Sequence, residues 1–193
     1  MRTPAALLLS LLIFSVPALA EPTYPPQSIY HLDAALTDQS GKQIRLDVQR
    51  GHPVLVTMFY ASCPMTCPML IDTLRAIEHA VPQSQRSNLR VLMISIDAER
   101  DTPEKLRRLA EQRRMDLSRW TLVRADATTV RKVAALLNVE YRQLPDGNYN
   151  HSNVVSLLSP HGEIVGQSTM LGKADDAIVQ ALAELTPAPS SNP

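Results

Sequence analysis

The apolar positions of the chain fall into continuous runs that alternate with helically spaced stripes. Continuous runs of apolar and β-branched residues predict three strands covered on both faces, over residues 54–60, 89–96 and 120–123. Near the C-terminus, residues 153–158 and 163–167 flank a Ser-Pro-His-Gly turn and therefore predict a hairpin.

Helical stripes follow most of these strands, with apolar residues three or four positions apart. The four stripes are Leu70, Ile71, Leu74 and Ile77; Leu106, Leu109 and Ala110; Val130, Val133, Ala134 and Leu137; and Ala174, Ile178, Ala181, Leu182 and Leu185. A first hairpin is predicted from residues 31–36 and 42–48 around a turn at 38–41. The order of elements predicts a single α/β domain with a mixed central sheet, helices on both faces and an N-terminal hairpin extension.

The two ends of the chain differ from this pattern. Residues 1–20 combine Arg2, a twelve-residue apolar run and the small-residue ending Pro-Ala-Leu-Ala, which predicts a cleaved secretory signal peptide. An uncleaved membrane anchor is disfavoured because a spanning helix needs roughly 20 apolar residues. We expect an extended lead-in over residues 21–27, the folded domain over 28–186 and a disordered tail over 187–193.

Charge and composition exclude some functions. The chain has 193 residues, with 19 Lys and Arg against 19 Asp and Glu, and only 4% of its residues are aromatic. A nucleic-acid-binding protein normally has a clear excess of basic residues, so we expect no nucleic-acid partner. An exported protein meets an oxidising compartment, where a pair of cysteines can form a disulfide unless a partner reduces it.

The two cysteines, Cys63 and Cys67, stand four positions apart in Cys-Pro-Met-Thr-Cys-Pro, where a buried strand leads into a helix. We expect Cys67 to cap this helix with Pro68 in its first position, and Cys63 to lie in the loop over its N-terminus. The helix dipole should then favour the thiolate form. A structural disulfide across so short a loop contributes little stability, which leaves two alternatives, a redox-active dithiol and a thiolate pair for a soft metal.

A metal site of this kind needs a third ligand. Of five histidines, His151 is the best candidate because it ends a polar loop directly before a buried strand, from where it could face another strand-end loop. Met65, between the cysteines, and Met69 offer thioether sulfur, which suits Cu(I), although most methionines simply fill gaps in a core.

Three segments together resemble the Sco/SenC family over roughly residues 27–185. They are Cys-Pro-x-x-Cys-Pro after Phe-Tyr, then Ile-Ser-Ile-Asp-x-Glu-Arg-Asp-Thr-Pro from residue 94, and Tyr-x-His-Ser from residue 149. The resemblance implies a thioredoxin-like fold and a role in copper delivery during cytochrome c oxidase assembly. It also implies Cys63, Cys67 and His151 as copper ligands, with Asp97 as an acidic residue near the site.

From the resemblance we expect a periplasmic metallochaperone rather than a conventional enzyme. Its cofactor would be copper, as Cu(I) and, as a second option, Cu(II). Its partners would be the copper subunit of cytochrome c oxidase, other periplasmic copper chaperones and a protein that reduces thiols. The main alternative is a thiol–disulfide oxidoreductase acting on periplasmic cysteine pairs, in which His151 would tune a thiolate. A peroxidase of the same broad fold is a weaker alternative.

Overall fold

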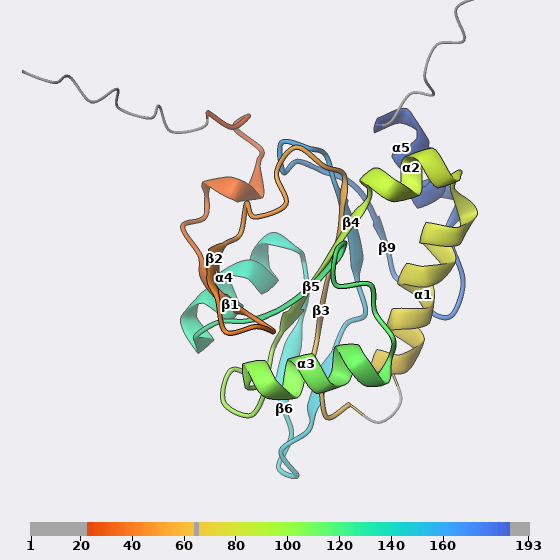
Figure 1. The fold of residues 1–193 in the computed structure, drawn as a ribbon. Coiled ribbons are helices and arrows are strands. Elements are labelled where there is room, and N and C mark those ends of the chain that lie inside the picture. The colour runs from red at the N-terminus through yellow and green to blue at the C-terminus, as the bar shows by residue number, and fades with distance from the viewer. Residues whose placement is uncertain (1–22, 64–65, 186–193) are drawn as a thin grey trace, which may run out of the picture.

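The computed structural model describes residues 23–63 and 66–185, which form an α/β domain (Figure 1). The predicted signal peptide, the predicted tail and Met65 lie outside the described residues. The sheet has the strand order β2-β1-β5-β4-β3-β8-β9. Its strands are β1 (Ala35–Asp38), β2 (Gln43–Arg45), β3 (Val54–Phe59), β4 (Arg90–Ser95), β5 (Trp120–Arg124), β8 (Val155–Leu158) and β9 (Ile164–Ser168).

The strand directions confirm the predicted mixed sheet. Strands β3, β4 and β5 run parallel, whereas β8 pairs with β3 and β1 pairs with β5 in antiparallel fashion. All residues of β3 and β8 are buried, as expected for central strands covered on both faces. The carboxyl ends of parallel strands form one edge of such a sheet, which is the usual place for chemistry in α/β folds.

The described residues form five α-helices. They are α1 (Thr66–Ala80), α2 (Gln83–Asn88), α3 (Pro103–Gln112), α4 (Ala127–Leu136) and α5 (Asp176–Leu185). Figure 1 shows α4 on the side of the sheet opposite to α1 and α5, so helices lie on both faces as predicted. Within the part of the chain that is described, no helix is long and apolar enough to span a bilayer.

Two sequence predictions about elements are wrong. Residues 29–31 form a 3-10 helix capped by the Ser28 side chain, so the first strand begins only at Ala35. The helix at the cysteines begins at Thr66, which places Cys67 inside the first turn rather than at the cap. Pro68 is still among the first four residues, whose N–H groups have no partner within the helix, so its ring is tolerated.

A small second sheet was not predicted. It consists of β6 (Tyr141–Gln143) and β7 (Tyr149–His151), two antiparallel strands that pair only with each other. Figure 1 shows this hairpin projecting beyond the end of the main sheet. His151 therefore lies at the base of a projecting hairpin and not in an irregular loop.

Candidate metal and thiol site

The cysteine loop begins where β3 ends. Tyr60 is buried directly after the strand, and its backbone carbonyl accepts a hydrogen bond from the Cys63 N–H at 3.2 Å. The Ala61 N–H donates to the Asp101 carboxylate at 2.8 Å. These backbone hydrogen bonds fix the turn that carries Cys63 away from the sheet edge.

The two sulfurs lie close to each other and to Tyr60. The Cys67 N–H, in the first turn of α1, donates to the Cys63 sulfur at 3.4 Å, and the Cys67 thiol donates to the Tyr60 carbonyl at 3.4 Å. The structure has no disulfide between them. A helix N-terminus favours a negatively charged group, so the Cys63 sulfur is well placed to carry charge.

Cys67 contradicts the expectation that the helix dipole favours the thiolate form of both cysteines. Its side chain is only 4% exposed, and burial raises its pKa well above that of an ordinary thiol. The nearby Cys63 sulfur adds to this shift. The cost of burying a charge therefore outweighs the helix dipole at Cys67, and the group is a neutral thiol at neutral pH.

His151 has one satisfied ring nitrogen and one unsatisfied one. Its Nδ1 lies 3.1 Å from the Ser152 carbonyl oxygen, a contact that suits the tautomer with the proton on Nδ1. Its Nε2 is buried and has no hydrogen-bond partner. Burial lowers the pKa of His151, so the ring is neutral and Nε2 holds a lone pair. A neutral imidazole with one nitrogen fixed by a backbone carbonyl is the form in which histidine binds metals.

Tyr60 connects the histidine to the cysteines. Its ring meets the His151 ring edge-on, with 5.9 Å between centroids, and the Tyr149 ring at 5.5 Å. Burial raises the pKa of Tyr60, and a side-chain hydrogen bond with Cys63 contributes to the increase. Among residues 23–63 and 66–185, however, no three His, Cys, Asp or Glu side chains are close enough to enclose a metal ion. The three predicted ligands thus all lie next to Tyr60 but do not form a closed metal site.

Asp97 is buried, with 1% of its surface exposed, and its carboxylate forms an ion pair with Arg100 at 2.5 Å. Met69 is 44% exposed in the first turns of α1. Met65, the other methionine predicted to offer a thioether sulfur near the thiolates, is outside the described residues.

Sequence reasoning missed Tyr60 and Asp101 as organising residues. Asp101 is fully buried and accepts hydrogen bonds from Ala61 and from the Ser95 hydroxyl, while forming an ion pair with Lys105 at 3.0 Å. The available signal was that Tyr60 directly follows one buried strand and that Asp101 lies in the segment between the next buried strand and its helix, at the sheet edge where the cysteines also lie.

Comparison with known proteins bears on this geometry. The family model described as SCO1/SenC matches residues 25–186, which includes both cysteines, Asp97 and His151. The chain belongs to the SCO1/SenC family.

Two relatives illustrate the range of similarity within the family. A protein of Stutzerimonas stutzeri, named as copper-binding, is 24% identical over 133 residues, covering 68% of this chain and 65% of its own length. A SCO2-like protein of Rickettsia typhi is 35% identical over 72 residues, covering 37% of this chain and 35% of its own. The chain thus spans less than two thirds of the length of either relative.

Solved structures confirm the fold. A protein of Aquifex aeolicus superposes with a TM-score of 0.71 at 22% identity, over 88% of this chain and 96% of that one. ScoI of Arabidopsis thaliana, solved with copper bound, gives 0.68 at 19% identity, over 79% and 94%. BsSco, a Sco protein of cytochrome c oxidase assembly with a disulfide switch, gives 0.66 at 16% identity, over 84% and 96%. The domain therefore has the thioredoxin-like fold of Sco proteins.

Proposed function

We propose that the reduced protein carries one copper ion, held by the sulfurs of Cys63 and Cys67 and by Nε2 of His151. The observation that carries this proposal is the buried, unpartnered Nε2 of a neutral histidine that contacts Tyr60. A buried polar atom without a hydrogen bond is costly, and a metal ion would satisfy it. The copper-bound state of Arabidopsis ScoI, a structural relative, supports copper as the ion.

The donor set suits Cu(I). Thiolate sulfur is a soft ligand that selects Cu(I) over hard cations, and imidazole nitrogen also binds copper well. Because the pKa of Cys67 is raised, copper binding would displace a proton from its thiol. We therefore expect copper affinity to fall as the pH is lowered.

Copper binding would require the β6–β7 hairpin to approach the cysteine loop. Among the described residues, β6 and β7 pair only with each other, so a shift of the whole hairpin would move His151 without breaking the ladder of the main sheet. An open site of this kind would let a receiving protein reach the bound ion and take it.

The biological role follows from the family. We infer that the protein is exported with its signal peptide removed and delivers copper to the copper subunit of cytochrome c oxidase in the periplasm. Other copper chaperones would supply the ion, and a thiol reductant would keep the two cysteines reduced. The assignment of BsSco to cytochrome c oxidase assembly supports this role.

The two cysteines also favour a second candidate, a thiol–disulfide oxidoreductase. Cys63 is partly exposed, whereas Cys67 is buried with a raised pKa, an arrangement that suits an attacking and a resolving thiol. The Cys63 thiolate would attack a partner disulfide to form a mixed disulfide. Cys67 would then displace the partner sulfur, so the partner gains two electrons and two protons while Cys63 and Cys67 become a disulfide.

A Cu(I) competition titration tests the proposed copper site. Anaerobic reduced protein and the variants Cys63→Ser, Cys67→Ser and His151→Ala are titrated against a chromophoric Cu(I) chelator. We expect each cysteine variant to lose at least 100-fold in affinity and His151→Ala to lose roughly 10-fold to 100-fold. Equal affinity in all four proteins would rule out the site.

An insulin-type disulfide reduction assay separates the two functions. If thiol exchange is the main role, reductase activity persists in His151→Ala and in the presence of a Cu(I) chelator. If copper transport is the main role, the same variant loses copper affinity and the wild type shows little turnover.

A further inference from the structure

The β6–β7 hairpin, which carries His151, forms no strand pairing with the main sheet. Its tip is closed by backbone hydrogen bonds from Leu144 to Asn148 at 2.7 Å and from Gly147 to Leu144 at 2.9 Å. Its base is held by the Ser152 N–H, which donates to the Glu140 carbonyl at 2.9 Å. Since β6 and β7 pair only with each other, side-chain contacts from the domain must set the angle of the hairpin.

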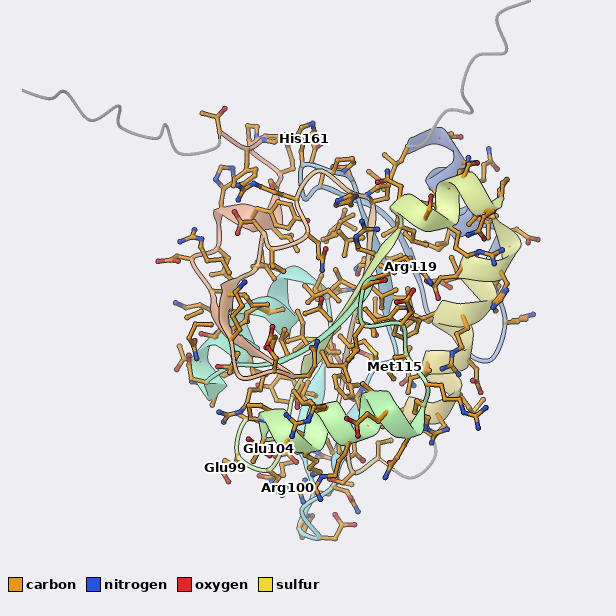
Figure 2. All side chains as sticks on the ribbon, in the orientation of Figure 1. Glu99, Arg100, Glu104, Met115, Arg119 and His161 are labelled. Carbon is orange, nitrogen blue, oxygen red and sulfur yellow. The ribbon has the colours of Figure 1, made fainter. Side chains whose placement is uncertain are left out.

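Arg100 supplies such a contact at the tip. Its guanidinium donates from Nη2 to the Gly147 carbonyl, and its Cζ lies 5.8 Å from the centroid of the Tyr149 ring. The fit against the backbone is close, because a Cβ added to Gly147 would lie 3.1 Å from Nη1 of Arg100. Figure 2 shows Arg100 below α3, at the end of the molecule from which the hairpin projects.

Asp97 fixes the direction of the Arg100 side chain. One carboxylate oxygen accepts from Nε of Arg100 at 2.5 Å and the other from its backbone N–H at 3.1 Å. The Asp97 N–H in turn donates to the buried hydroxyl of Ser95 at 3.0 Å. A planar guanidinium held at Nε is left with its terminal N–H groups directed outward, toward the hairpin.

The same segment also holds the cysteine loop. Asp101 accepts from the Ala61 N–H, and its partner Lys105 donates to the Ser62 hydroxyl at 3.0 Å. Residues 95–101 therefore contact the cysteine loop through Asp101 and the histidine hairpin through Arg100. A shift in either contact changes the separation between the sulfurs and the imidazole.

We propose that Arg100 is a positioning residue that orients the β6–β7 hairpin so that His151 can join the two sulfurs on one copper ion. This inference rests on the proposed function. Arg100 does not touch the ion; it acts by limiting the conformations of the hairpin, so that less ordering is needed when copper binds.

A double-mutant cycle with His151 tests this inference. Copper affinity is measured by Cu(I) competition for the wild type, Arg100→Ala, His151→Ala and the double variant. Partners outside a metal's ligand shell typically change its affinity 10-fold to 100-fold, so we expect Arg100→Ala to weaken binding by about 10-fold. In the His151→Ala background the same change should have no further effect, because Arg100 acts only through His151.

Two further variants control for folding and charge. Arg100→Lys keeps the positive charge beside Asp97 but lacks the planar fork that also reaches Gly147, so it should remain folded and still bind copper more weakly. Arg131→Ala, which removes an exposed arginine from α4, should leave copper affinity unchanged. The EPR spectrum of the Cu(II) form adds a readout that global stability does not move, since Arg100→Ala should weaken the nitrogen hyperfine pattern of His151.

The outcomes separate this inference from the proposed function. If His151→Ala weakens copper binding but both Arg100 variants retain wild-type affinity, the positioning role is wrong and the copper site stands. Arg100→Ala could instead weaken copper binding by the same factor in the His151→Ala background as in the wild type. In that case Arg100 does not act through His151, and the inference is overturned. If His151→Ala itself has no effect, both the ligand set and the positioning role fail.

Discussion

At the scale of the residue, the two cysteines of one motif have different environments. The Cys63 sulfur accepts a hydrogen bond at the start of α1 and is partly exposed, whereas Cys67 packs beneath it against Tyr60. The difference follows from their positions, because Cys67 lies in the first turn of α1 and packs into the core, whereas Cys63 lies in the loop after β3. Each sulfur can therefore be examined separately by its reactivity.

Alkylation should distinguish the two thiols. With reduced protein at pH 7, we expect iodoacetamide to modify Cys63 at least 10-fold faster than Cys67, because Cys67 is buried and its raised pKa leaves almost no thiolate. The reactivity of Cys67 should rise only at strongly alkaline pH. Peptide mass spectrometry at a series of times and pH values measures both rates.

The single-cysteine variants provide the control. In Cys63→Ser the remaining thiol should stay slow at pH 7, since burial is the largest cause of its pKa shift and persists. Equal rates for the two cysteines, or faster modification of Cys67, would contradict the burial seen here.

Single residues show how far the sequence could predict the site. The residue types and their spacing were enough to select Cys63, Cys67 and His151 as candidates. The sequence could not reveal that Tyr60 contacts the other three or that Asp101 receives the Ala61 N–H. The contacts from Tyr60 to His151 and from Asp101 to Ala61 join residues distant along the chain, and periodicity carries no information about them.

At the scale of the element, a buried polar cluster joins α1 to the start of β5. Glu78, only 4% exposed, accepts hydrogen bonds from the Trp120 indole N–H at 3.2 Å and from the Arg119 guanidinium. Arg119 also forms an ion pair with Asp116 at 2.9 Å (Figure 2 labels Arg119 at this end of β5). The cluster fixes the angle of α1 and thereby the position of its first turn, which holds Cys67.

Removing the Glu78 carboxylate should destabilise this junction. We expect Glu78→Ala to lower the free energy of unfolding by roughly 2–4 kcal/mol, because Trp120 and Arg119 lose their acceptor inside the protein. Glu78→Gln keeps an acceptor oxygen and should lose much less. Urea denaturation followed by circular dichroism measures both, and equal stability of the two variants would show that the hydrogen bonds contribute nothing.

The elements were predicted well where they are apolar and poorly where they are polar. Strands β3, β4 and β8 are continuous apolar runs and lie within two residues of their predicted bounds. Strands β6 and β7 have the sequences Tyr-Arg-Gln and Tyr-Asn-His, which lack any apolar alternation. Only the Pro-Asp-Gly turn between them, with Gly147 at φ +82°, indicated the hairpin.

At the scale of the whole molecule, copper binding should be linked to folding. An ion bound by the folded state alone stabilises it by an amount set by its free concentration relative to the dissociation constant, about 2.7 kcal/mol at a 100-fold excess. We expect Cu(I) to raise the unfolding free energy of the reduced protein by this amount. Oxidised protein, whose sulfurs are joined to each other, should gain little.

Denaturant titrations of the reduced and oxidised forms, each with and without buffered Cu(I), measure this linkage. Cys63→Ser serves as the matched control, because it cannot form the disulfide and lacks one copper ligand. A stabilisation of the same size in the oxidised protein would mean that copper binds at a place other than the two cysteines.

The distribution of aromatic residues has a consequence for spectroscopy. The only tryptophan, Trp120, is 2% exposed and pairs with Val91 at the starting edge of the parallel strands, whereas Tyr60, Tyr141 and Tyr149 cluster around the hairpin at the other edge. Indole fluorescence will therefore follow the melting of the α1–β5 junction, while three of the five tyrosines will contribute an absorbance change for events near His151. One sample thus yields two optical signals weighted toward opposite ends of the same sheet.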